Sequence, residues 1–208
     1  MNINTIIFDL GGVIVNLNEG ATVEELVRLA PARAQTIEQA YKHAQFFKSY
    51  EMGLMTDEEF RTCIRELLGV DVRDQEIDTA WNAMLGDIPV ERLQLMTRLR
   101  SRYNVMVLSN TNAIHVKSFN QTIQQVSGKP DLTSFADRVF FSHELNLRKP
   151  HVEIYQKVIE LAGIVAHEAI FLDDKLDNLN GARQAGLRTL HIAKPDDVLN
   201  IESHVEQQ

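Results

Sequence analysis

Five short apolar segments, each followed by polar residues, limit the folds open to this chain more than any other feature. In the first, Thr5–Phe8, every residue is β-branched or aromatic, and Asp9 follows directly. A strand without polar alternation is typical of a parallel sheet that is buried on both faces. Similar segments occur at Val105–Leu108, Val139–Phe141, Ala169–Leu172 and Thr189–Ile192. The sequence therefore predicts a parallel β-sheet.

Helical patterns lie between these strands. They cover Val90–Arg100, Ile114–Gln125, Val152–Ala162 and Leu176–Ala185. The alternation of strand and helix predicts the α/β class, with a Rossmann-like, doubly wound parallel sheet. Ligands bind at the carboxyl ends of the strands in such sheets, so we expect Asp9, Ser109 and Asp173 to converge.

The alternation is interrupted between residues 17 and 88, where only helical patterns occur. They cover Thr22–Ala30, about 35–50, Asp57–Leu68 and about 74–85. We interpret this segment as an inserted α-helical bundle. The predicted domains are a core of residues 1–16 and 89–208 and a helical cap of residues 17–88.

Local signals indicate where helical structure begins and where it ends. Thr22 with Glu25 and Thr56 with Glu59 both fit the capping box, in which two side chains satisfy free backbone amides reciprocally. The tail, residues 201–208, is polar and is expected to be a frayed end.

Charge and cysteine content restrict the partners and the compartment. The net charge of -8 and the absence of a dense basic run argue against nucleic acid and anionic membranes as partners, which favours a small substrate. The single cysteine, Cys63, cannot form an intramolecular disulfide, and no signal peptide or membrane span is apparent at the N-terminus. We therefore expect a cytoplasmic protein, and the sequence indicates no particular oligomeric state.

Carboxylates follow two of the predicted strands. Asp9 precedes Gly11 and Gly12, and Asp173 is adjacent to Asp174. Asp9 alone could merely cap a turn, but two adjacent carboxylates repel unless a cation or solvation offsets their charge. A set of oxygen ligands favours Mg²⁺, and without a cysteine–histidine cluster zinc is not expected.

Four motifs in order complete the pattern. They are Phe8–Val13, Leu108–Thr111, Lys149 within Arg148–Pro150, and Asp173–Asn178 continuing to Gly181, Ala182 and Gly186. With these motifs the sequence resembles the haloacid-dehalogenase-like hydrolases of the subclass whose helical cap follows the first motif. Within that superfamily it is similar to members with Phe-Asp-Leu-Gly-Gly or Phe-Asp-Leu-Gly-Asn, some of which resemble sugar-phosphate phosphatases.

The resemblance implies a catalytic nucleophile and a metal site. Asp9 would attack phosphorus and form an aspartyl-phosphate that water then cleaves. Mg²⁺ would be held by Asp9, the carbonyl group of Gly11 and Asp174, with Asp173 bound directly or through water.

The resemblance also implies a phosphate-binding set. Ser109 and the backbone amides of Asn110 and Gly12 would hold phosphate oxygens, and Lys149 would place a positive charge beside Asp9. Asn178 is expected to support these groups from behind. Taken alone, Ser109 could cap the following helix, and Lys149 could be an ordinary solvated lysine.

Gly11 departs from the pattern of the superfamily's typical phosphatases, which carry a second aspartate at this position as general acid. General acid–base catalysis contributes about 10²–10⁴ in rate, so its loss matters for an alkyl phosphate. The substrate could have a good leaving group, another residue could supply the proton, or the protein could bind phosphorylated ligands and turn them over poorly. Glu51, His115 and His143 are the candidate substitute acids.

Two further functions compete with the leading hypothesis of a magnesium-dependent phosphatase of a small phosphorylated metabolite. The first is a phosphate-binding or regulatory protein with weak or no turnover, which Gly11 favours. The second is a dehalogenase, in which Asp9 displaces halide without a metal. The pair Asp173 and Asp174 argues against a dehalogenase, as does the lack of an aromatic residue in Leu10–Gly12.

Overall fold

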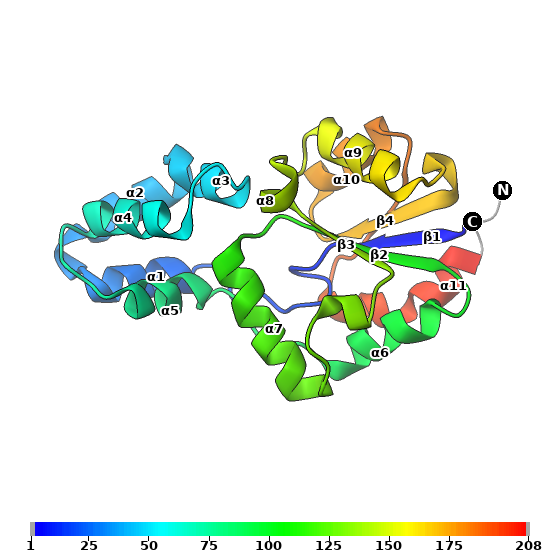
Figure 1. Cartoon of the computed structure of the whole chain (residues 1–208), viewed down its shortest axis with the longest axis horizontal. Helices are drawn as coiled ribbons and strands as arrows, with labels where there is room; N and C mark the ends of the chain where they lie inside the picture. Colours follow the sequence, from blue (N-terminus) through cyan, green and yellow to red (C-terminus); the bar gives the residue numbers. More distant parts are fainter. Residues whose placement is uncertain (1–2, 207–208) are drawn as a thin grey trace.

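The structure is a computed structural model that describes residues 3–206. Its centre is one parallel sheet with the strand order β3-β2-β1-β4-β5 (Figure 1). The strands are β1 (Thr5–Phe8), β2 (Asn104–Ser109), β3 (Arg138–Phe141), β4 (Ala169–Asp173) and β5 (Arg188–His191). In register, Phe8 of β1 lies between Val107 of β2 and Leu172 of β4. The predicted α/β parallel sheet is confirmed, with each strand within a residue of its expected bounds.

Helices cover both faces of the sheet (Figure 1). One face carries α6 (Val90–Leu99), α7 (Ala113–Ser127) and α11 (Ile201–Glu206), and the other carries α9 (Val152–Ala162) and α10 (Leu176–Gln184). A short helix, α8 (Ser142–Leu145), follows β3, and four 3₁₀ segments lie at Pro31–Arg33, Leu132–Ser134, Ala166–Glu168 and Pro195–Asn200. Alternate strand residues face opposite layers, so Ile6 and Phe8 belong to one core cluster and Ile7 to the other. The sheet is therefore buried on both faces.

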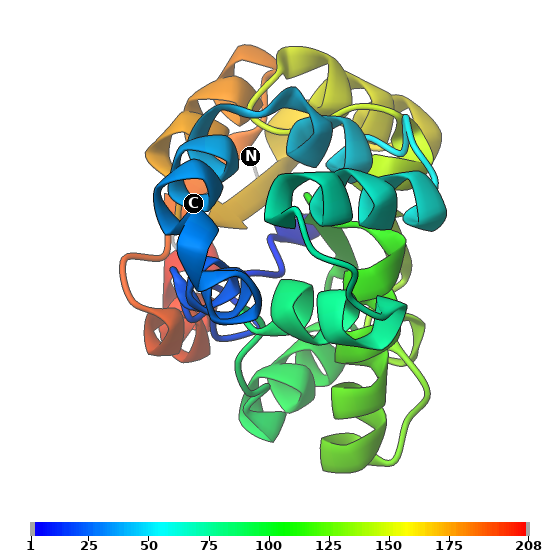
Figure 2. The same ribbon diagram turned by 90° about the vertical axis from the view of Figure 1, so that its left-hand side faces the viewer.

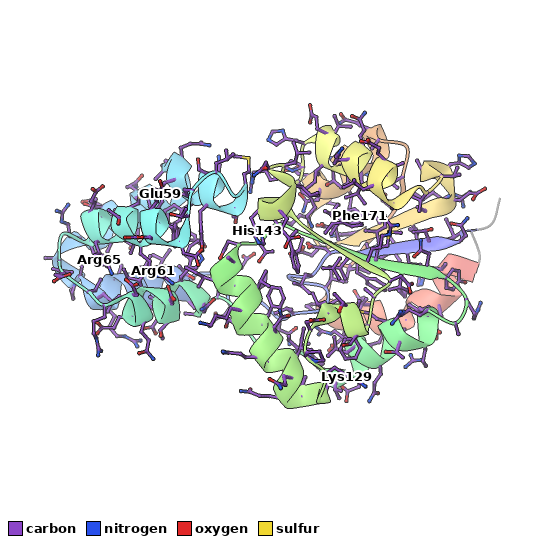
Figure 3. The ribbon with its side chains drawn as sticks, viewed as in Figure 1. Glu59, Arg61, Arg65, Lys129, His143 and Phe171 are labelled. Carbon is purple, nitrogen blue, oxygen red and sulfur yellow. The ribbon has the colours of Figure 1, made fainter. Side chains whose placement is uncertain are left out.

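Five helices between β1 and α6 form a separate group beyond the carboxyl ends of the strands (Figures 1 and 2). They are α1 (Ala21–Leu29), α2 (Ala34–His43), α3 (Gln45–Glu51), α4 (Asp57–Leu68) and α5 (Asp74–Asn82). Their own core includes Phe60 and Trp81, whose ring centroids are 4.9 Å apart. Arg61, labelled in Figure 3, donates two hydrogen bonds of 2.8 Å from α4 to Asp78 of α5. We propose that this group is the cap, with the boundaries near residues 17 and 88 in the segments that link it to the core.

The predicted cap of α1 is wrong. The helix begins at Ala21 after Gly20, which has a left-handed backbone and provides no side-chain cap. Thr22 is instead buried, and its hydroxyl group donates to the carbonyl oxygen of Trp81 at 3.0 Å. The buried carbonyl group of Trp81 needs a hydrogen-bond donor, and α5 packs against α1 so that the hydroxyl group of Thr22 supplies it. This hydroxyl group is therefore not available to cap α1. The capping box of Thr56 and Glu59 at α4 is confirmed.

Two other expectations about helices need correction. The helix expected over about 35–50 is divided at Ala44, whose extended backbone separates α2 from α3. The tail expected to fray instead forms α11 up to Glu206, with Ile201 and Val205 buried in the core. Those two residues are four apart and so share one helix face, while residues 207 and 208 lie outside the described part. Within residues 3–206 no helix combines the length and apolar character that a bilayer span requires.

Candidate active site

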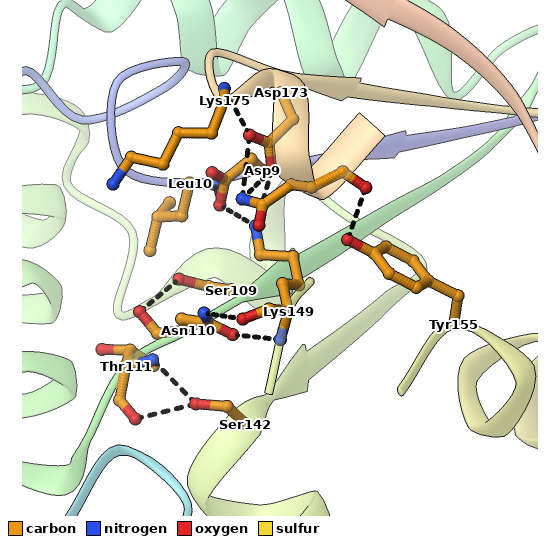
Figure 4. A network of polar contacts seen from close by, with 11 residues as sticks. Asp9, Leu10, Ser109, Asn110, Thr111, Ser142, Lys149, Tyr155, Asp173 and Lys175 are labelled. Carbon is orange, nitrogen blue, oxygen red and sulfur yellow. Dashed lines mark hydrogen bonds and ion pairs between the residues drawn. The ribbon is translucent and has the colours of Figure 1, made fainter. Parts of the chain in front are cut away.

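Asp9 lies at the carboxyl end of β1, where the chain turns sharply. The residue is 6% exposed, and its Oδ1 accepts a hydrogen bond of 2.6 Å from the amide of Leu10 (Figure 4). Gly12 has φ +78°, and a Cβ atom there would lie 2.6 Å from Oδ2 of Asp174. The second glycine of the sequence motif thus brings the backbone against a carboxylate, at a position where a side chain would collide.

Lys149 joins the carboxylates of two neighbouring strands. Its ammonium group lies 2.7 Å from Oδ1 of Asp9 and 2.9 Å from Oδ2 of Asp173, and its side chain is 1% exposed. The amide group of Asn178 donates to both oxygens of Asp173, at 3.0 and 2.9 Å. Lys149 is therefore not the solvated lysine that the sequence allowed, and Asn178 orients Asp173 from behind.

The residues present fit a divalent cation. One oxygen from each of Asp9, Asp173 and Asp174 lies within 4.8 Å of the others. Oδ1 of Asp174 is buried, and no residue in the described part of the chain donates a hydrogen bond to it. The ammonium group of Lys149 pairs with Asp9 and Asp173 but not with Asp174, so the three carboxylates are not all neutralised by ion pairs. Such a set of oxygen ligands suits Mg²⁺, and Gly11 lines the cavity next to them.

Burial and charge shift the pKa values of these groups in different directions. Burial raises the pKa of Asp9 to about 8 against the lowering effect of Lys149. Burial and then the charge of Asp173 raise the pKa of Asp174. Burial also disfavours ionised Asp173, but Lys149 lowers the pKa of Asp173 overall. Two of the three carboxyl groups thus resist ionisation, and a nearby cation would favour their charged forms.

Ser109 and Asn110 follow β2 at the same sheet edge. The side chain of Asn110 accepts a hydrogen bond from the amide of Lys149 at 2.9 Å and donates to its carbonyl oxygen at 3.0 Å. The side chain of Asn110 thus fixes the backbone of Lys149. The backbone amide of Asn110 is the group that is expected to bind phosphate. Ser109 is buried and does not cap α7, because the side chain of Asn112 holds that position.

A cavity of about 560 Å³ opens beside Asp9, between the sheet edge, the end of α3 and the segment that follows α5. Ser109, Asn110 and Lys149 line one part of it together with Asp9. Other lining residues come from the segments that flank the cap and from α3, α7 and α10: Leu17, Glu51, Met84, Leu85, His115, Phe119, Leu176 and Asp177. The cavity thus joins a polar end to a largely apolar wall.

The sequence of residues 3–186 matches the family model of haloacid dehalogenase-like hydrolases. The chain belongs to this family. Among curated relatives, D-ribitol-5-phosphate phosphatase of Bacteroides thetaiotaomicron is 29% identical over 187 residues, which cover 90% of each protein.

Solved structures of the family are similar to this chain over nearly its whole length. A family enzyme from Bacteroides thetaiotaomicron, solved with magnesium and inorganic phosphate, has a TM-score of 0.85 and 36% identity and covers 91% of this chain and 94% of its own. A predicted family hydrolase of Porphyromonas gingivalis has a TM-score of 0.83 and 28% identity, with 92% and 91% covered. The resemblance drawn from the four motifs is confirmed.

None of the three candidate substitutes for the family's general acid fits that role in this structure. The carboxylate of Glu51 is held in an ion pair, 2.9 Å from the guanidinium of Arg148. Burial lowers the pKa of His115 to about 3, so its ring is neutral near pH 7. His143 is not among the residues that line the cavity.

Sequence reasoning missed two features of the cavity wall. In the sequence Arg148 is marked only as the neighbour of Lys149, yet it joins Glu51 of α3 to the core. No sequence pattern marks Asn82, although its side chain lies 2.9 Å from the ring of His115. Both pairs join residues far apart in sequence, and only the proximity of Arg148 to Lys149 could have drawn attention to it.

Proposed function

We propose that this chain is a magnesium-dependent phosphatase of small phosphorylated metabolites. The observation that carries the proposal is the convergence of Asp173 and Asp174 with Asp9 and Lys149, the two of these residues that line the polar end of the cavity. A curated relative named as a phosphatase, and a similar enzyme solved with magnesium and inorganic phosphate, support it. The carboxylate cluster also disfavours a dehalogenase, which has no use for a divalent cation at this place.

Asp9 is the nucleophile in this proposal. A carboxylate oxygen of Asp9 attacks phosphorus, the bond to the leaving oxygen breaks, and an aspartyl-phosphate forms. Water then attacks phosphorus, which releases inorganic phosphate and restores the carboxylate. Lys149, 2.7 Å from Asp9, favours the ionised nucleophile and attracts the phosphate group. Ser109 and the backbone amide of Asn110 hold the phosphate oxygens. The backbone amide of Gly12, which was expected to join them, donates instead to the carbonyl oxygen of Val15 at 2.8 Å.

Mg²⁺ would be held by Asp9, Asp174 and the carbonyl group of Gly11, with Asp173 as a direct or water-mediated ligand. When bound, the ion supplies positive charge that offsets the repulsion between an anionic nucleophile and an anionic phosphate. The protein's own contribution is to keep the carboxylates in place: Asn178 and Lys149 hold Asp173, and Gly12 leaves room for Asp174.

We propose a phosphorylated polyol or sugar as the substrate class. D-Ribitol-5-phosphate phosphatase is similar to this chain over 90% of its length, and a cavity of about 560 Å³ has room for a ligand of that size. With Gly11 in place of the family's acid and no fitting substitute among Glu51, His115 and His143, we propose that water in the cavity protonates the leaving oxygen.

A panel of phosphate esters tests the proposal. Purified protein is incubated with Mg²⁺ and polyol, sugar, acyl and nucleotide phosphates, and released phosphate is measured. We expect Asp9→Asn to lose activity about 10³-fold or more, because the nucleophile is removed. The exposed Asp71→Asn is the control for the same chemical change away from the cavity and should behave as wild type.

The competing function, phosphate binding without substantial turnover, gives a different result. Wild type would then release no more phosphate than Asp9→Asn from any compound of the panel, which would refute the phosphatase. Mg²⁺ with beryllium fluoride would still raise the Tm of wild type, because the fluoride complex mimics a phosphoryl group on Asp9. Phosphate release without a Tm shift would contradict the assignment of Asp9.

A further inference from the structure

His115 lies where the cap meets the core. It is in the first turn of α7, and its ring stacks on Trp81 of α5 with the centroids 5.0 Å apart and the planes 8° apart. Its backbone amide donates to the side chain of Asn112 at 3.0 Å. Nδ1 of the ring lies 2.9 Å from Oδ1 of Asn82, the last residue of α5. Stacking and hydrogen bonding together fix the plane and the direction of this imidazole.

The contact with Asn82 determines which ring nitrogen carries hydrogen. A carbonyl oxygen accepts hydrogen bonds and cannot donate them, so Nδ1 of His115 is the donor and Nε2 keeps its lone pair. Burial lowers the pKa of this side chain, so the neutral form persists at pH 7. His115 lines the cavity at 6% exposure. Among the described residues its ring has one hydrogen-bond contact, at Nδ1, and Nε2 is not one of the fully buried side-chain atoms that lack a partner, so Nε2 is accessible.

We propose that Nε2 of His115 accepts a hydrogen bond from a hydroxyl group of the substrate's leaving group. This inference rests on the proposed phosphatase and makes His115 a specificity residue, separate from the groups that act on phosphate. The same cavity is lined by the apolar side chains of Met84, Leu85 and Phe119. A fixed acceptor among apolar side chains distinguishes a substrate with a hydroxyl group there from one without it.

The same arrangement disfavours an acidic leaving group. A carboxylate or a second phosphate has only acceptor atoms. These atoms cannot donate a hydrogen bond to Nε2 of His115, so the two lone pairs would repel each other. The guanidinium of Arg148, on the cavity wall, is already paired with Glu51 at 2.9 Å, while Lys175 lines another part of the cavity. At the position of His115, the inference therefore favours phosphates whose leaving group carries a hydroxyl group.

Two substitutions of His115 distinguish the role of Nδ1 from that of Nε2. The amide of His115→Asn replaces Nδ1 and its contact with Asn82, but nothing replaces Nε2. The longer side chain of His115→Gln places an amide where Nε2 lies and restores an acceptor. D-Ribitol 5-phosphate is the hydroxylated probe, and acetyl phosphate is the probe without hydroxyl groups. The quantity measured is the ratio of kcat/KM for the two probes, with Mg²⁺ present.

We expect this ratio to fall about three- to tenfold in His115→Asn, the loss typical of one neutral hydrogen bond, and to recover in His115→Gln. An equal loss on both probes, or an unchanged ratio, would overturn the inference. If wild type hydrolyses acetyl phosphate but no hydroxylated phosphate, the phosphatase stands and the role of His115 is refuted. If wild type hydrolyses nothing, the phosphatase proposal itself fails and this inference with it.

A measurement on the resting enzyme checks the tautomer without turnover. Nitrogen-15 NMR at pH 7 should show neutral His115 with hydrogen on Nδ1, and the same state should be absent from His115→Gln. Hydrogen on Nε2 would remove the proposed acceptor and refute the inference whatever the kinetics.

Discussion

At Gly12 the chain passes beside a carboxylate of the proposed metal site, and both backbone conformation and lack of space require glycine there. Its φ of +78° is unfavourable for any residue with a side chain, and a Cβ atom would lie 2.6 Å from Oδ2 of Asp174. At Gly128 only the backbone conformation requires glycine, because its φ is +72° and a Cβ atom there would meet nothing within 4 Å. The two glycines therefore allow backbone strain to be separated from collision with Asp174.

We expect Gly12→Ala and Gly128→Ala both to lose stability, by about 1–2 kcal/mol from the left-handed backbone alone. Only Gly12→Ala should also raise the Mg²⁺ concentration needed for half-maximal activity, by about tenfold or more, because Asp174 must move. Urea unfolding and a magnesium titration of the rate measure the two effects. Equal magnesium dependence in the two variants would contradict the assignment of Asp174 as a metal ligand.

The site shows which residue-level predictions a sequence permits. Asp9, Lys149 and Asp173 could be expected to meet, because polar residues that close parallel strands share one edge of the sheet. The pair of His115 and Asn82 could not, since it depends on how α5 packs against α7. Such packing across separate elements leaves no fixed spacing in the sequence.

At the scale of elements, the strands were predictable and the cap helices only partly so. Each strand is an apolar run with a polar end, and that pattern is local. The division at Ala44 was missed because apolar residues continue at helical spacing on both sides of it. The start of α1 was misplaced because the carbonyl group of Trp81, 59 residues further along the chain, takes the hydroxyl group of Thr22. Tertiary contacts override local helix signals in such cases.

The end of α3 docks closely on α8, and this contact joins cap and core. The hydroxyl group of Ser142 donates to the carbonyl oxygen of Glu51 at 2.6 Å, and the amide of Asn146 donates to that of Met52 at 2.9 Å. Gly53 has φ +66°, and a Cβ atom there would lie 2.0 Å from the carbonyl oxygen of His143, which is labelled in Figure 3. A side chain at this position would force the two elements apart.

We expect Gly53→Ala to raise KM for the best substrate of the panel several-fold, because Glu51 lines the cavity and moves with α3. Gly163→Ala is the matched control, since its φ is +65° and a Cβ atom there would have open space. Both variants should lose stability from the backbone, but only Gly53→Ala should show faster amide exchange in α3 and α8. A KM equal to that of Gly163→Ala would mean that docking of α3 does not shape the cavity.

At the scale of the whole molecule, the burial of His115 between cap and core links stability to pH. Burial holds its pKa at about 3 in the folded protein, against 6.5 for an unperturbed histidine. Below pH 6.5 His115 therefore binds a proton in the unfolded chain but stays neutral in the folded protein until the pH approaches 3. The stability that depends on neutral His115 is fully present above pH 6.5 and is lost progressively as pH falls toward 3.

Between pH 7.5 and 5 we expect wild type to lose about 2 kcal/mol more than His115→Asn, because the asparagine does not titrate. Urea unfolding of both proteins across this range measures the difference, and groups common to both, including His143, cancel in the comparison. A parallel course of the two stability curves would mean that His115 takes up a proton in the folded state. The cap would then have to open without unfolding, since neutral His115 depends on the closed contact with Trp81 and Asn82.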